Sequence, residues 1–179
     1  MVAVNLSEVW LRPSLIVFSL NEPMPELSGS PAAPTGKWDF GTGGSTLYLT
    51  DDNRSPLQVS VERLESKRRM IDGTMRSVHV ADKRGFSTSW ENIPSRKLNG
   101  SVSITSDGFG AGIDIKDWYE ANYDDFWMLL IYDNNDDVTV GSGVNVEKYN
   151  VFFDSFDFTI TKRGQYNDLW DLSIDLVEV

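Results

Sequence analysis

Apolar and polar residues alternate with a period of two along much of this chain, and the alternation predicts β-strands. Phe86, Thr88 and Trp90 alternate with two serines and a glutamate, so one face of this segment is large and apolar while the other is small and polar. The same alternation recurs at residues 57–61, 101–105, 155–161 and 170–176. The chain is therefore expected to be mainly β and antiparallel.

Turn residues divide these strands. Asp72-Gly73 predicts a hairpin with a type I′ turn, because that turn needs positive φ angles, which Asp and Gly tolerate best. Further turns are expected at residues 83–85 and 162–164, and Pro94 is expected to end the strand that begins at Phe86.

Two apolar runs predict buried strands. Residues 126–132 form a continuous run suited to a central strand that is covered on both faces. Residues 15–20 also predict a buried strand, and the alternative, a signal peptide, fits less well because the run is short and follows Glu8. No run approaches the length of a membrane-spanning helix.

One helix is predicted, because Ile115, Trp118, Tyr119 and Asn122 recur at helical spacing. Asp114 is expected to cap its start. The glycines at 108, 110 and 112 are arranged somewhat like a dinucleotide fingerprint, but Ile113 occupies the place of its third glycine. This glycine-rich segment is therefore interpreted as the loop that leads into the helix.

The first 56 residues hold six of the seven prolines and are expected to form an N-terminal arm with strands, separate from a domain at 57–179. Residues 21–36 predict a long loop or arm, which either packs on a neighbouring subunit or is simply mobile. Residues 41–44 are rich in glycine but do not lead into a helix, so a loop between strands is favoured over a phosphate site.

The charge is negative overall and unevenly distributed. The net charge of −11 disfavours binding to nucleic acid or to an anionic membrane. Residues 54–97 carry ten Lys/Arg and five Asp/Glu, a local charge of +5, whereas residues 98–179 carry four and sixteen, a charge of −12. The division is interpreted either as an ordinary solvated surface or as a basic edge that meets an acidic edge on another copy.

Nothing in the chain forms a recognisable catalytic or metal site. There is no cysteine, and the single histidine, His79, is expected to be a strand residue without a catalytic role, because no Gly-x-Ser-x-Gly motif accompanies it. The acidic loop 133–137 is the best calcium candidate, but Val138 and Val144 stand where that loop type requires Gly and Glu, so a hairpin tip is favoured. No enzyme activity, cofactor or metal is predicted. Core packing is expected for most of the tryptophans at 38, 90, 118, 127 and 170.

Several short sequences follow one another in a fixed order along residues 57–179. They are Arg69-Met-Ile-Asp-Gly-Thr-Met-Arg76, Ala81-Asp-Lys-Arg84, Phe86-Ser-Thr-Ser-Trp90, Trp118-Tyr-Glu-Ala-Asn122, Lys162-Arg-Gly164, Tyr166, Trp170 and Glu178-Val179. In this order they resemble tail structural proteins of long-tailed bacteriophages, usually labelled minor tail or tail tube proteins. The first 56 residues have no counterpart in that pattern.

The resemblance implies an antiparallel β-sandwich of tail-tube type with one flanking α-helix. It implies assembly into a homo-oligomeric ring or tube, together with other tail proteins, around a channel that DNA passes without specific binding. The protein would be made in the bacterial host cytoplasm and end in the virion, with no membrane partner. Acidic strand faces at Asp157, Asp171 and Asp175 would then repel phosphate inside the channel. Basic residues are predicted to contact the neighbouring subunit: Lys67, Arg68, Arg69, Arg76, Lys83 and Arg84.

Other functions stay open from the sequence. A head-to-tail connector or a capsid-decorating protein is an alternative among structural proteins. A carbohydrate-binding module at the tail tip is the alternative from a different class.

Overall fold

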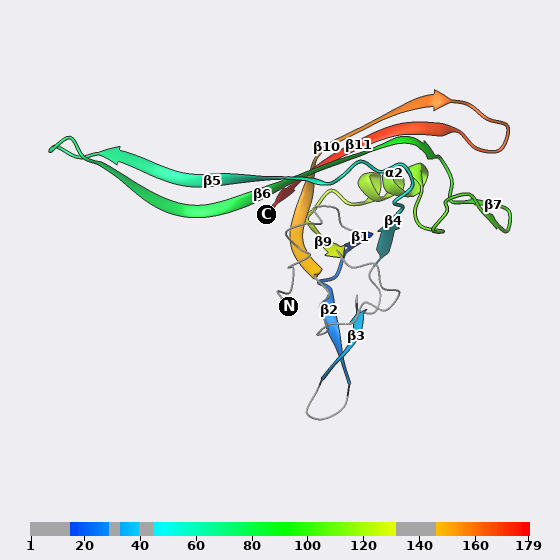
Figure 1. Cartoon of the computed structure of the whole chain (residues 1–179), viewed down its shortest axis with the longest axis horizontal. Helices are drawn as coiled ribbons and strands as arrows, with labels where there is room; N and C mark the ends of the chain where they lie inside the picture. Colours follow the sequence, from blue (N-terminus) through cyan, green and yellow to red (C-terminus); the bar gives the residue numbers. More distant parts are fainter. Residues whose placement is uncertain (1–14, 29–32, 40–44, 132–145) are drawn as a thin grey trace, which may run out of the picture.

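The protein is mainly β, with one seven-stranded antiparallel sheet and one short helix in the part of the chain that is described (Figure 1). The structure is a computed structural model that describes residues 15–28, 33–39, 45–131 and 146–179. The strand order is β4-β1-β9-β10-β11-β6-β5. None of the helices in these ranges is long and apolar enough to cross a membrane.

The large sheet combines strands from both ends of the chain. Its members are β1 (Leu15–Ser19), β4 (Thr46–Leu49), β5 (Gln58–Arg69), β6 (Met75–Pro94), β9 (Phe126–Ile131), β10 (Val146–Lys162) and β11 (Leu169–Glu178). Two small sheets pair β2 (Met24–Ser28) with β3 (Ala33–Asp39), and β7 (Leu98–Asn99) with β8 (Val102–Ser103). The helix is α2 (Gly112–Ala121).

The main core lies between α2 and one face of the sheet. Ile115 and Trp118 of α2 are buried against apolar residues of the sheet, and Trp118 contacts Phe18 and Phe126 with ring centroids 6.1 and 5.9 Å apart. We call this side of the sheet the helix face. The alternating residues of β6 and β11 contribute to it through Phe86, Thr88, Trp90, Leu172, Ile174 and Leu176. A smaller cluster of Val17, Leu129 and Ile131 forms on β1 and β9.

Several predictions from the sequence are confirmed. The apolar runs form β1 and β9, whose residues are almost all buried. Of the tryptophans, Trp90, Trp118 and Trp170 are buried, Trp127 is half-buried, and the side chain of Trp38 lies outside the described residues.

The predicted turn at residues 83–85 is wrong. The chain runs straight through these residues as the 20-residue strand β6. Gly85 pairs there with Ser60 of β5 and with Val177 of β11, and a Cβ atom at this position would lie 2.6 Å from the Ser60 Oγ atom. The glycine therefore allows three strands to approach closely and does not reverse the chain.

The predicted hairpin at Asp72-Gly73 is present, but its turn is not type I′. The amide of Gly73 donates to the carbonyl of Met70 and the amide of Met70 donates to Thr74, which leaves a three-residue loop. Within the loop Gly73 has a φ of +84°, whereas Asp72 is not in the positive-φ region. The Asp72 carboxylate instead accepts from the amide and the hydroxyl of Thr74, at 3.0 and 2.6 Å. Gly73 therefore has the left-handed backbone conformation that a three-residue hairpin loop needs at its last position.

Segments before residue 57 take part in the sheet. The strands β1 and β4 hydrogen-bond into the same sheet as the later strands, and the segment expected to be a long loop contains the hairpin of β2 and β3. The domain boundary at residue 57 stays a prediction. The glycine loop at 41–44 and the acidic loop at 133–137 lie outside the described residues.

The helix starts earlier than expected. Its N-cap is Ala111, and Asp114 lies in the first turn, where its carboxylate accepts the amide of Ala111 at 2.9 Å. A carboxylate here also interacts favourably with the helix dipole.

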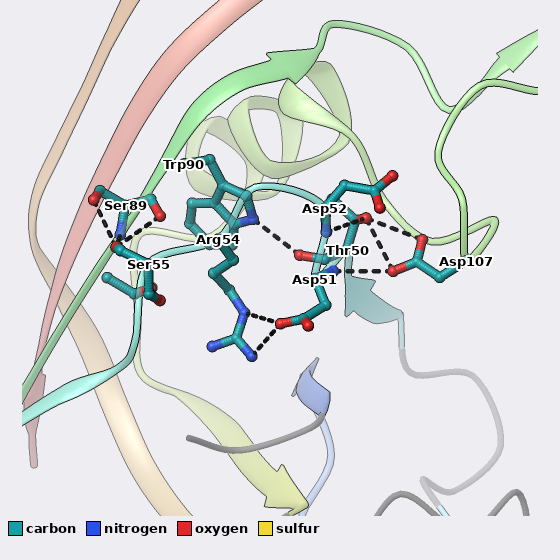
Figure 2. A network of polar contacts seen from close by, with 9 residues as sticks. Thr50, Asp51, Asp52, Arg54, Ser55, Ser89, Trp90 and Asp107 are labelled. Carbon is teal, nitrogen blue, oxygen red and sulfur yellow. Dashed lines mark hydrogen bonds and ion pairs between the residues drawn. The ribbon is translucent and has the colours of Figure 1, made fainter. Parts of the chain in front are cut away.

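A polar network fixes the connection between β4 and β5 against β6 (Figure 2). The buried indole of Trp90 donates from Nε1 to the carbonyl of Thr50 at 2.9 Å, and the Thr50 hydroxyl donates to Asp107. The guanidinium of Arg54 is buried and donates from Nε and Nη2 to Asp51 at 3.0 and 2.7 Å. These bonds determine where β5 starts, and therefore where it joins β6.

Replacing Trp90 with Phe is expected to lower the free energy of unfolding by about 2–4 kcal/mol, because the Thr50 carbonyl loses its indole donor in a buried site and ring volume is lost. Urea denaturation followed by fluorescence would measure it. Trp127→Phe is the matched control, expected to cost less than about 1 kcal/mol because this ring is only half-buried. Equal losses for both variants would contradict the role given to Trp90.

Candidate functional site

The hairpin of β5 and β6 projects far beyond the helix-covered core (Figure 1). Its last pairing with β11 is at Gly85, so residues 61–84 form a two-stranded arm, which we define by these bounds. Every residue of β5 is exposed. A lone two-stranded hairpin is at best marginally stable in water, so an arm of this length is expected to gain stability from a partner surface.

On one face of the arm, charged side chains form ion pairs and hydrogen bonds with one another. Arg63 is paired with Asp82 at 3.3 Å, and His79 Nε2 lies 2.8 Å from the same carboxylate. On the same face Glu65 accepts the Ser77 hydroxyl at 2.7 Å and forms an ion pair with Lys67. The Lys67 ammonium lowers the pKa of Glu65, and the His79 ring lowers the pKa of Asp82. We call this side the paired face of the arm.

The opposite face carries apolar and basic side chains. The register places Leu64, Ser66 and Arg68 of β5 on this side with Arg76 and Val78 of β6. Leu64 is 40% exposed and Val78 is 64% exposed. We call this side the open face. The tip of the arm adds Ile71 in the loop and Met70 and Met75 beside it, all exposed.

Two arginines oppose each other on the open face. Arg68 and Arg76 are direct cross-strand partners, and like charges in this position destabilise a strand pair. Neither of them, nor Arg69, forms an ion pair with another described residue. Carboxylates from outside the arm would relieve this repulsion.

The six predicted contact residues separate into two groups. Lys67, Arg68, Arg69 and Arg76 lie in the outer half of the arm, with Lys67 and Arg69 on the side of the paired face. Lys83 and Arg84 lie at its base and bind within the chain: Lys83 donates to the carbonyl of Val179, and Arg84 lies 4.9 Å from the ring centroid of Tyr149 and donates to its hydroxyl. Arg68, Arg69 and Arg76 are therefore the strongest contact candidates.

The three predicted channel acids lie on one face of the sheet, opposite the helix face. The pairing of β10, β11 and β6 puts Asp157 beside Ser173 and Ser89, and Asp175 between Ser155 and Ser87. Asp171 is in the same row, opposite Thr159. We call this surface the acidic face. Whether it faces a channel stays a prediction.

Two shallow grooves run along the acidic face. One, with a volume of about 350 Å³, is lined by Asp157 and Asp171, and the next, of about 330 Å³, by Asp154 and Asp175. Among the described residues that line them there is no Lys or Arg. The amide of Asn92, whose φ is +54°, donates to Asp171 at 2.8 Å. The face therefore presents negative charge held in place by the backbone and by serines.

The serines favour the charged form of Asp175. The hydroxyls of Ser87 and Ser155 lower the pKa of this carboxyl, and Ser155 donates at 2.7 Å. Fixed donors of this kind keep the Asp175 carboxyl charged at a lower pH than an ordinary aspartate.

His79 lies on the paired face of the arm and is exposed, with Asp82 and Arg63 as its polar neighbours. Among the described residues no group of three or more His, Asp or Glu side chains could hold a metal ion. The arrangement is suited to contact with another surface through charge and apolar area.

The open face of the arm was not predicted from the sequence. Val78 lies on the open face because β6 has an extra residue, Val80, between the pairs of Leu64 with Ala81 and of Glu65 with His79, and this residue reverses the alternation of β6 beyond it. Ile71, two residues after Arg69, was a sequence signal for this contact surface, since an apolar residue in a charged turn is unusual.

The chain matches no protein-family model and no curated protein sequence. Its function is therefore inferred from its own residues and geometry.

Replacing both Ser87 and Ser155 with Ala is expected to raise the pKa of Asp175 toward its ordinary value, as measured by NMR titration of the carboxyl carbon. A carboxyl with a lowered folded-state pKa stabilises the fold above its unfolded-state pKa, and this contribution is lost as the pH falls through the folded-state value. The double variant should therefore be less stable than the wild type at pH 7 and equally stable at the lowest pH. Ser173→Ala is the control, and an unchanged Asp175 titration in the double variant would contradict the assignment.

Proposed function

We propose that this protein is a structural component of a bacteriophage tail that self-assembles into a ring or tube around the DNA channel. The observation that carries the proposal is the arm, a long projecting hairpin with an apolar and basic open face. The order of short sequences along residues 57–179 that resembles tail proteins gives the class of assembly.

The exposure of the arm supports a contact with another chain. Side chains such as Val78 and Ile71 gain roughly 1.5–3 kcal/mol each when they are fully buried, and in the described chain they stay in solvent. Monomeric soluble proteins rarely leave a continuous apolar surface uncovered. A neighbouring subunit would cover it.

The acidic face supports the channel. The carboxylates of Asp157, Asp171 and Asp175 share one face of the sheet with serines and a threonine. Among the described residues that line the two grooves of this face, none is basic. A wall of this composition repels phosphate and would let DNA pass without binding. The finer fold assignment, a sandwich of tail-tube type, belongs to the same proposal.

The carbohydrate-binding alternative has less support. The tryptophans, which offer the largest flat ring for a sugar, are buried in the core at Trp90, Trp118 and Trp170, and the most exposed described rings are the tyrosines Tyr123 and Tyr166. Light scattering and negative-stain imaging of the purified chain separate the functions. Rings or tubes are expected, and a protein that stays monomeric at all concentrations and binds glycans would overturn the proposal.

Shortening the arm is expected to abolish assembly without loss of fold. Because Arg63 and Asp82 are cross-strand partners, an Asn-Gly turn can join them directly and remove residues 64–81. The shortened chain should unfold at nearly the same temperature as the wild type, since the removed part lies outside the core. Rings that persist in negative stain would contradict the role of the arm.

A further inference from the structure

We propose that the open face of the arm docks on the C-terminal end of helix α2 in a second copy of this chain. The inference rests on the proposed self-assembly and names the two surfaces that meet. We define the receiving surface as Tyr119, Glu120, Tyr123 and Asp124, and call it the helix-end surface.

The helix-end surface is aromatic and negative. Tyr123 is 89% exposed, and Tyr119 is 38% exposed while its ring stacks on Phe156 with centroids 4.7 Å apart. Glu120 and Asp124 are exposed beside them. The last turn of α2 has no basic residue. The C-terminal end of a helix is the negative end of its dipole and favours a cation, and these carboxylates add to that negative charge. Lys116, one turn earlier, already pairs with Glu120 at 2.6 Å, so Asp124 and the helix dipole supply most of the negative charge of this surface.

The open face of the arm has the complementary character. It offers Arg68 and Arg76, which repel each other across the strand pair and lie just beyond the apolar Leu64 and Val78, toward the tip of the arm. Tyrosine rings can bury such aliphatic groups and also receive a guanidinium on their faces. Carboxylates at the rim would neutralise the arginines.

The acidic face fits the arm less well. The grooves there are lined by serines and aspartates, and two of these aspartates already accept bonds from Asn92 and Ser155. Docking on the helix-end surface also leaves the acidic face open to the channel.

The contact must join two copies. The tip of the arm lies far from α2 of its own chain (Figure 1). A contact between two different surfaces is heterologous, so its repetition yields a closed ring or an open helical tube. This is the geometry that the proposed function requires.

Charge exchange tests the contact. Arg68→Glu with Arg76→Glu is expected to raise the concentration needed for assembly by roughly tenfold or more, and Glu120→Lys with Asp124→Lys should do the same. Because each chain carries both surfaces, combining the four substitutions should restore rings. Light scattering and negative stain provide the readout, and circular dichroism confirms that each variant is folded.

The matched control combines the arm variant with Asp157→Lys and Asp171→Lys, which should not restore assembly. Rescue of assembly by this control, or no rescue by the helix-end substitutions, would overturn the docking inference. The proposed function would still be supported if the wild-type chain forms rings. A wild-type chain that never assembles would overturn both. Tyr123→Ser, which changes no charge, should also weaken assembly, and an unchanged assembly threshold would count against the contact.

Discussion

The hydrogen bond from the buried Trp90 indole to the Thr50 carbonyl joins the two halves of this fold. It ties the connection after β4 to the C-terminal part of β6, beside the ion pair of the buried Arg54 with Asp51. With that connection fixed, β5 begins at Gln58 and pairs with β6 along its whole length. The outward direction of the arm thus depends on a polar contact inside the core.

The strand β6 belongs to both the core and the arm. Its second half pairs with β11 from Gly85 to Pro94 and with β5 as far as Ser87, and its Phe86 and Trp90 are buried on the helix face. Its first half pairs with β5 alone and stays in solvent. A continuous strand transmits the orientation of the core to the arm without a hinge, so a partner surface would meet the arm in a defined position. This lowers the entropy lost on association.

The large sheet and the arm each have two faces of different composition. The sheet buries apolar residues under α2 and presents Asp157, Asp171 and Asp175 on the other side. The arm holds its own ion pairs on the paired face and leaves Arg68 and Arg76 on the open face. The proposed assembly uses the acidic face for a channel and the open face for a neighbour, so neither surface has to serve both purposes.

The sequence by itself determined the strand character of the chain and the buried runs at 15–19 and 126–131, because period and hydrophobicity are local properties. That Asp157 shares one face of the sheet with Asp171 and Asp175 depends on the pairing of β10 with β11. Only the tertiary structure decided that residues 83–85 continue a strand, since Gly85 is a turn residue until β5 and β11 approach it from both sides. It also decided which side of the arm is open, because the extra residue Val80 shifts the register. Pairing between distant strands cannot be read from the local pattern alone.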